Sequence, residues 1–451
     1  MNKTIYKHAR IITGGGELIE DGTIIIKHVQ KDFTAPAQDE KPVKIAPSVS
    51  DVIEYIGASE ECPETEADEV FDISGYTVIP GLIDCNTRLD TLNKKADDYV
   101  DNIGIPYRTY ISYRNAAEAL NCGVTTLRAE GMPNNIDIAL KTAVNNTMFY
   151  GPSILATGPI YAVTGGKGHE KYGLIECSGT DAFRAQMRIH VSRGLDGVIL
   201  QVTGDRLSTL NGEYHKEMSD AELRALVKQA AGAQKQVAVN ASGDKSIRAC
   251  IDAGVNCIQQ GYRMDDSLLE EMARKKIAYL PCLVSTLGTD VEQEHRQVVA
   301  QAVKKGVKVA VGTGILPSEP VDGTTAVIKE MELLVEMGMS PMEAVMAATA
   351  TAAEVCGCKA GKLTQGGKAD FVIVEGKPDE DISAMRNIRA VVKSGRRAFY
   401  EVNGEKERMF HIHAPLYHVA GGTTFDWTEG ALTGVKEPAN YNVEWNLVKE
   451  I

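Results

Sequence analysis

The sequence predicts an α/β protein in which a (β/α)8, TIM-like barrel is inserted into a small β-sandwich domain built from both chain ends. Two observations carry this prediction. Between residues 77 and 360, short apolar runs alternate with helical stretches in eight strand–helix units, the number of a closed parallel barrel. Residues 1–76 and 361–404 instead show short apolar runs separated by turns, which is typical of strands in a small sheet.

The strand candidates of the barrel are apolar runs bounded by turn residues. They begin at Thr77, Val124, Ser153, Gly197, Gln236, Cys257, Ile277 and Val307. Helices are expected in the gaps, for example over 220–233 and 244–253, and connections of this length suit right-handed parallel crossovers. A capping box marks one more helix, with serine at 340, proline at 341 and glutamate at 343. We expect that helix to run through Val355 and end near Gly357.

Two segments fall outside this pattern. Residues from about 30 to 50 are rich in Pro, Lys, Asp and Glu, which indicates a surface insertion in the N-terminal part of the small domain. Residues 405–451 carry several aromatic side chains, which favours a docked C-terminal tail over a disordered end. The tail also holds His411, His413 and His418, whose spacing permits a metal site, although packed or surface histidines are the commoner meaning of such a spacing.

Composition limits the partners. The net charge is −13 and the pI about 5.3, which argues against a nucleic-acid or anionic-membrane surface because both need clustered basic charge. No run approaches the roughly 20 apolar residues of a membrane span. Nine cysteines without a CxxC pair, and an N-terminus without an apolar signal core, lead us to expect a reduced, cytoplasmic protein.

Three runs carry a resemblance to a known family: VIPGLIDCNTR at 78–88, GVTTLR at 123–128, and GPSILATG at 151–158 followed by TGG at 164–166. They resemble the first, second and third barrel strands of the amidohydrolase superfamily, in the branch that includes imidazolonepropionases and prolidase-like dipeptidases. In that family the first-strand run reads PGLID-x-His-x-His. Residues 362–370 resemble the return into the sheet domain. The resemblance covers about residues 1 to 400 and implies the barrel fold.

The resemblance also implies a metal centre at the carboxyl ends of the barrel strands. Family ligands are two histidines on the first strand, a carboxylated lysine on the fourth, histidines on the fifth and sixth, and an aspartate on the eighth. Carried over in that order, these positions hold Asn86, Arg88, Ile199 (Leu200 if the alignment shifts by one), Asn240, Gln260 and Gly314. A guanidinium has no lone pair for Zn²⁺, and carboxamides are not its usual ligands. We therefore expect no metal or other cofactor, and no metal-activated water.

Other polar residues at the predicted barrel mouth remain as candidates for binding. Asn86 and Arg88 lie two residues apart and should share a face. A guanidinium there can hold a carboxylate in a bidentate pair, or it can form a structural ion pair with Glu130. Thr203, Asn240 and Gln260 keep hydrogen-bonding groups at the mouth, for a substrate or for one another.

A lysine follows the third-strand motif, where relatives carry a substrate-contacting histidine. A partly desolvated lysine loses its proton more readily, so Lys167 is a candidate base or Schiff-base nucleophile, with Glu130 or His169 as its partner. A solvated loop lysine is the alternative.

Two classes of function follow from these residues. In the first, the chain is an enzyme that binds a small polar or carboxylate-bearing metabolite and acts on it by metal-independent acid–base chemistry. In the second, it is a noncatalytic binding or scaffold protein that partners an active paralogue. Five polar side chains at the predicted barrel mouth favour the first class: Asn86, Arg88, Lys167, Asn240 and Gln260. Relatives of this kind are often oligomeric, so a homo-oligomer is expected.

The expectation of a metal-free centre can be measured directly. Elemental analysis of untagged protein, purified without chelator, should find less than about a tenth of an equivalent of Zn, Fe, Mn or Ni. A near-stoichiometric metal would contradict the argument and would make His411, His413 and His418 the first residues to mutate.

Overall fold

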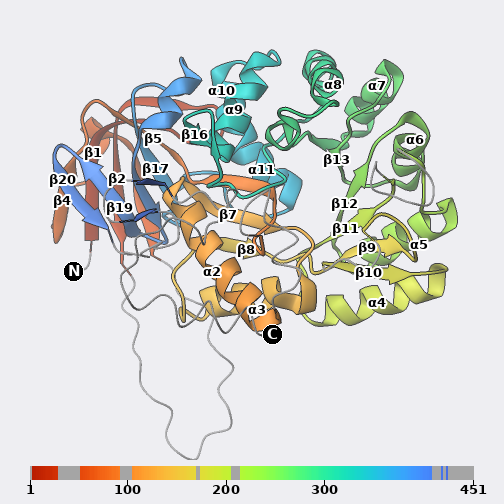
Figure 1. Cartoon of the computed structure of the whole chain (residues 1–451). Helices are drawn as coiled ribbons and strands as arrows, with labels where there is room; N and C mark the ends of the chain where they lie inside the picture. The colour runs from red at the N-terminus through yellow and green to blue at the C-terminus, as the bar shows by residue number, and fades with distance from the viewer. Residues whose placement is uncertain are drawn as a thin grey trace, which may run out of the picture.

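The computed structural model describes residues 3–28, 51–91, 104–168, 173–204 and 214–408, together with the short segments 418–419 and 423–424. The expected insertion at about 30–50, His169, and His411 and His413 of the tail lie outside the described residues. A sheet domain occupies one side of the molecule and the barrel with its surrounding helices the other (Figure 1). None of the described helices combines the length and apolarity needed to cross a membrane.

The sheet domain is built from both ends of the described chain, as predicted. Its strands run β20-β19-β18-β17-β5-β1-β2-β3, with β4 beside β1. Strand β17 pairs antiparallel with β5, which joins the two chain ends. The strand bounds are β1 Lys3–Ile12, β2 Leu18–Lys27, β3 Val52–Ala58, β4 Glu69–Asp72, β5 Tyr76–Pro80, β17 Phe371–Glu375, β18 Ile388–Lys393, β19 Arg396–Val402 and β20 Glu405–Arg408.

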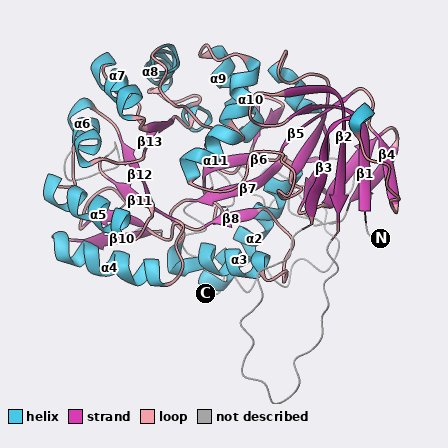
Figure 2. Ribbon diagram, turned by 180° about the vertical axis from the view of Figure 1, so that it is seen from behind, coloured by secondary structure: helices cyan, strands magenta, loops and turns pink. Residues whose placement is uncertain are grey.

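The barrel strands are parallel and are flanked by helices on the outside (Figure 2). Their bounds are β6 Leu82–Thr87, β7 Val124–Ala129, β8 Ser153–Leu155, β11 Gly197–Gln201, β12 Gln236–Ala241, β13 Cys257–Gln260 and β14 Ala278–Leu280. Two further strands extend this sheet: β9 Ile160–Val163 pairs with β11, and β10 Leu174–Cys177 pairs with β9. Short pairs occur at β15 Pro320–Val321 with β16 Thr324–Thr325, and at β21 His418–Val419 with β22 Thr423–Thr424.

The helices alternate with these strands. They are α2 Ile105–Asn121, α3 Ile136–Asn145, α4 Thr180–Ser192, α5 Asp220–Gly232, α6 Asp244–Ala253, α7 Asp266–Lys275, α8 Glu292–Lys304, α9 Ala326–Glu336, α10 Pro341–Ala347 and α11 Ala350–Cys356. Short 3₁₀ turns are η1 Ser59–Glu61, η2 Pro133–Asn135, η3 Leu283–Thr286 and η4 Ile382–Asn387.

Backbone hydrogen bonds close the ring where regular pairing stops. The Asp196 amide donates to the Ala156 carbonyl at 2.7 Å, which joins β8 to β11. The segment 307–311, expected as the eighth strand, makes only an isolated bridge between Val309 and Tyr279. It nevertheless lies between β14 and β6, because the Cys85 amide donates to the Val311 carbonyl at 3.0 Å. The predicted barrel is therefore present, and its eighth member is an irregular extended segment.

The chain leaves the sheet domain later than the sequence suggested. The strand expected to open the barrel at Thr77 is β5, which pairs with β1 and β17 in the sheet domain. The first barrel strand starts at Leu82, directly after Gly81. A Cβ atom at Gly81 would lie 2.1 Å from the Thr125 hydroxyl oxygen, so only glycine permits this close crossing between domains.

The capping box at Ser340 is confirmed, but the helix it starts is short. The Ser340 hydroxyl accepts from the Glu343 amide, and α10 then ends at Ala347. Its last carbonyls serve the barrel instead: the Ala348 carbonyl accepts from the Ile83 amide at 2.7 Å. Helix α11 restarts at Ala350, and its inner face packs against the apolar layer inside the barrel, which includes Cys85. The single helix predicted here is therefore two helices. It is interrupted because amides of the barrel segments donate to the backbone carbonyls that would otherwise continue it.

A buried glutamate links α9 to the barrel and gives the fold a pH dependence. The Glu330 carboxylate accepts from the Leu283 amide at 2.9 Å and the Val284 amide at 2.7 Å. Burial raises its pKa to about 8, with a smaller contribution from Asp84. A raised carboxyl pKa means that the folded state holds the proton more tightly than the unfolded chain does. The free energy of unfolding should therefore fall as pH rises from about 4.5 to 8.

Urea unfolding of wild type and Glu330→Gln at pH 5 and pH 8.5 measures this dependence. Wild type should lose more stability between the two pH values than the glutamine variant, by on the order of 1–3 kcal/mol. Equal losses in both proteins would show that Glu330 does not titrate in this range.

Candidate functional site

A buried layer of polar side chains lies at the carboxyl ends of the barrel strands. We call it the mouth network. It consists of Arg128 and Glu130 from the β7 end, Gln201 from β11, Asn240 from β12 and Gln259 from β13. All five side chains are at least nine-tenths buried.

Two hydrogen bonds of this network reach across the barrel from β7. The Asn240 Nδ2 donates to Glu130 Oε1 at 2.8 Å and to Gln201 Oε1 at 3.4 Å. The Arg128 Nη2 donates to Gln259 Oε1 at 3.4 Å. The Gln201 Nε2 in turn donates to the Thr203 carbonyl at 2.7 Å. These contacts fix the orientation of each amide, because the Asn240 and Gln201 nitrogens face acceptors and the Gln201 and Gln259 oxygens face donors.

Strand alternation explains why these side chains point inward. On β12 and β13, Ala238 and Cys257 belong to the apolar layer inside the barrel. Asn240 and Gln259 lie two residues further along the same strands and are partners in the ladder. The polar layer therefore sits directly above the apolar one, at the end of the barrel where this fold places its active sites.

The end of β6 is tied to the eighth segment by a buried carboxylate. The Asp84 Oδ1 accepts from the Asn86 and Thr313 amides, both at 3.0 Å, and Oδ2 accepts from the Thr313 hydroxyl at 2.6 Å. Burial raises the pKa of Asp84 to about 7. Asn86 is fully buried, and its Nδ2 contacts the Cys282 sulfur at 3.6 Å. These contacts hold the Asn86 side chain inside the barrel.

The side chains at the six family metal positions do not fit a metal centre. Ile199 lies in the apolar layer, and Gly314 has no side chain. The Asn240 amide nitrogen is taken up by Glu130. In the part of the chain that the structure describes, no group of three or more His, Cys, Asp or Glu side chains is placed to hold a metal ion. The metal content of the protein stays a prediction for elemental analysis.

Of the catalytic residues proposed from sequence, Lys167 and Glu130 belong to the described residues and are not joined to each other there. Lys167 lies in the turn after β9, where its backbone amide donates to Glu217 Oε2 at 2.9 Å. Among the described residues, no hydrogen bond or ion pair links Lys167 or Arg88 to Glu130, which accepts from Asn240 instead. The structural ion pair offered for Arg88 is thus not formed. Arg88 itself is half-buried and directly follows β6.

Two predicted binding residues are engaged with the protein itself. The Thr203 hydroxyl accepts from the Ser242 amide at 3.3 Å. Gln260 has a left-handed backbone, with φ of 67°, and its carbonyl accepts from the Tyr279 hydroxyl at 2.9 Å. Its neighbour Gln259 is the residue that faces the barrel interior. Sequence reasoning missed Arg128, Gln201 and Gln259, although Gln201 is the one polar side chain at the end of the otherwise apolar strand β11.

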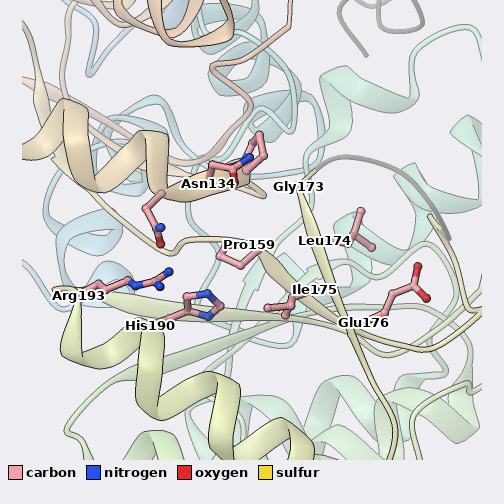
Figure 3. Close-up of a pocket in the computed structure, with 10 residues that line it drawn as sticks. Asn134, Pro159, Gly173, Leu174, Ile175, Glu176, His190 and Arg193 are labelled. Atoms are coloured by element: carbon pink, nitrogen blue, oxygen red, sulfur yellow. The ribbon is translucent and has the colours of Figure 1, made fainter. Parts of the chain in front are cut away.

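A separate cleft of about 520 Å³ lies between the η2 turn, β10 and the end of α4. Figure 3 shows Glu176 on one side, with His190 and Arg193 on the other. The His190 Nδ1 and the Tyr161 hydroxyl are 2.8 Å apart, and burial lowers the pKa of His190. No member of the mouth network lines this cleft. It is therefore distinct from the barrel mouth.

The fold and the position of this layer match a known class of protein. The model of the amidohydrolase family matches residues 77–398, and the chain belongs to that family. Among curated proteins it is similar to ochratoxinase of Aspergillus niger, with 26% identity over 392 residues that cover 75% of this chain and 79% of the relative.

Solved structures show the same fold. A Xaa-Pro dipeptidase crystallised with methionine in its active site has a TM-score of 0.74 and 25% identity, covering 88% of this chain and 99% of the other. The A. niger ochratoxinase structure has a TM-score of 0.73 and 21% identity, covering 88% and 96%.

The Glu130–Asn240 contact can be tested by exchanging its two ends. Asn240→Asp replaces the donor by a second buried carboxylate and should destabilise the fold by about 1–3 kcal/mol. The double variant Glu130→Gln with Asn240→Asp restores a donor opposite an acceptor and should recover part of that loss in urea unfolding. Additive effects of the two substitutions would show that the contact is not made.

Proposed function

We propose that this amidohydrolase-family protein binds a small polar or carboxylate-bearing metabolite at the barrel mouth and acts on it by metal-independent acid–base chemistry. The observation that carries the proposal is a set of buried polar atoms without a partner. The side-chain oxygens of Asn86 and Asn240, the Gln259 Nε2 and the Arg128 Nε are all buried, and none has a hydrogen-bond partner among the described residues.

Unpartnered buried polar atoms are costly and therefore informative. Each costs about 1–3 kcal/mol relative to a satisfied or apolar replacement, and native proteins contain few of them. Four of them gather around one end of one barrel. If the barrel held no ligand, apolar side chains at these positions would make the fold more stable. Position 199, which holds an isoleucine, is an example of such an apolar side chain. A ligand or ordered water in this layer supplies the partners that the protein lacks.

The chemistry available to such a ligand comes from side chains at the rim. Arg88 supplies a fixed positive charge suited to a carboxylate. Glu130 is a carboxylate able to accept a proton, and Lys167 lies on a neighbouring loop as a second acid–base group. The related Xaa-Pro dipeptidase holds methionine, a small amino carboxylate, in its active site. That likeness supports the carboxylate class for this chain.

One observation favours the alternative of a noncatalytic binding or scaffold protein. Glu130 is engaged by Asn240, and no described contact brings Lys167 to it. The two functions differ in turnover and share ligand binding, so binding is the property to measure first.

Binding can be screened with methionine and with methioninamide, which lacks the carboxylate. Methionine should raise the unfolding temperature of wild type more than methioninamide does. Arg88→Ala should weaken methionine binding by about tenfold or more, because a charge-assisted bidentate contact is removed. Arg88→Lys, which keeps the charge without the planar fork, should lie between them. An unchanged ligand profile in a folded Arg88→Ala protein would sink the role given to Arg88.

A further inference from the structure

The mouth network contains a buried guanidinium without a carboxylate partner. Arg128 is 4% exposed, and its one hydrogen bond to a described side-chain oxygen is the long contact to the neutral amide of Gln259. Its Nε has no hydrogen-bond partner among the residues that the structure describes. No ion pair joins Arg128 to an acidic side chain of this part of the chain, whereas the buried arginines Arg10 and Arg108 are paired with Asp379 and Asp90. A buried charge without a counter-charge is strongly unfavourable.

The acidic groups near Arg128 are engaged elsewhere or are largely protonated thiols. Burial raises the pKa of Cys257 to about 12 and that of Cys85 well above its ordinary value. Cys356 is the exception, because a hydrogen bond from Cys85 lowers its pKa. Glu130, two residues along the chain, accepts from Asn240. Asp84 of β6, whose pKa burial raises and Arg128 partly lowers, accepts from Thr313.

The strand register places a second guanidinium beside Arg128. Thr87 of β6 is the ladder partner of Ala129 of β7. Arg88 directly follows Thr87, and Arg128 directly precedes Ala129, so the two arginines lie close to this pair on neighbouring strands. Arg88 is at the rim of the barrel, and Arg128 is inside it. Together they bring two guanidinium groups to the neighbouring ends of β6 and β7.

The unpartnered atoms around this charge are of two kinds. Arg128 Nε and Gln259 Nε2 are donors without acceptors, and Asn86 Oδ1 and Asn240 Oδ1 are acceptors without donors. The amide orientations of Gln259 and Asn240 are fixed by their contacts to Arg128 and Glu130, so these atoms cannot exchange roles by a flip. A complementary ligand presents an anion to the donors and a hydroxyl or amine to the acceptors.

We propose that Arg128 and Gln259 form a carboxylate-binding seat inside the barrel, with Arg88 closing it from the rim, and that Asn86 and Asn240 accept from a hydroxyl or amine of the same ligand. The ligand class is a small hydroxy- or amino-carboxylate. This inference rests on the proposed function for the location of the ligand. It adds the residue that holds the carboxylate and the second group that the site recognises.

The sharpest test gives Arg128 an internal counter-charge. Gln259→Glu is nearly isosteric and places a carboxylate where the amide oxygen already accepts from Arg128. The variant should have a higher unfolding temperature and should bind lactate about tenfold or more weakly. The reason is that the new glutamate carboxylate occupies the position next to Arg128 where the ligand carboxylate would bind. Gln236→Glu makes the same change at the opposite end of β12 and should leave binding unchanged. Cys356→Ala should not weaken binding, because that thiol is not a ligand contact.

Matched probes test the two recognition elements in calorimetric titrations of the full-length protein. Lactate and alanine carry both groups, propionate lacks the donor, and lactamide lacks the charge. Wild type should bind lactate or alanine more tightly than propionate, and lactamide most weakly. Asn240→Leu should remove the preference over propionate.

The outcomes separate this inference from the proposed function. If Gln259→Glu leaves lactate binding unchanged while Arg88→Ala abolishes it, the seat at Arg128 is wrong and the proposed function stands. If neither lactate nor alanine binds wild type but methionine does, the ligand class inferred here is wrong and the proposed function again stands. If no carboxylate binds wild type, both are wrong.

Discussion

Every polar group that points into a closed barrel must find its partner inside that barrel, and this constraint shapes the rest of the protein. Here two contacts from β7 cross the interior, Glu130 to Asn240 and Arg128 to Gln259. Together with Asp84, which joins β6 to the eighth segment, they hold the strand ends in register. The same contacts leave four buried polar atoms without a hydrogen-bond partner among the described residues.

The chain has the fold of its family, but its side chains differ from those that the family resemblance implies for a metal site. Residues 77–398 belong to the amidohydrolase family, whose barrel is retained with its sheet domain. At the positions where the family resemblance implies metal ligands, this chain has amides, an arginine, an isoleucine and a glycine. One guanidinium, that of Arg88, stands at a position where the resemblance implies a metal ligand, and a second, that of Arg128, lies near the end of the neighbouring strand β7.

Several elements were predictable because their cause is local. The capping box at Ser340 needs only three residues, and the run around Gly81 marks the entry to the barrel. Tertiary contacts changed what followed each of them. Helix α10 stops at Ala347 because barrel strands take its last carbonyls, and β5 joins the sheet domain because β17 from the other chain end pairs with it.

The sequence by itself determined the family and the barrel with its sheet domain, because motif and alternation are properties of neighbouring residues. Only the tertiary structure decided which polar residues face one another. It placed Gln259 rather than Gln260 in the interior and left Lys167 without a described contact to Glu130. It also gave Arg128 a neutral partner in place of a carboxylate. Those outcomes depend on contacts between strands more than 100 residues apart, for which a single sequence carries no local signal.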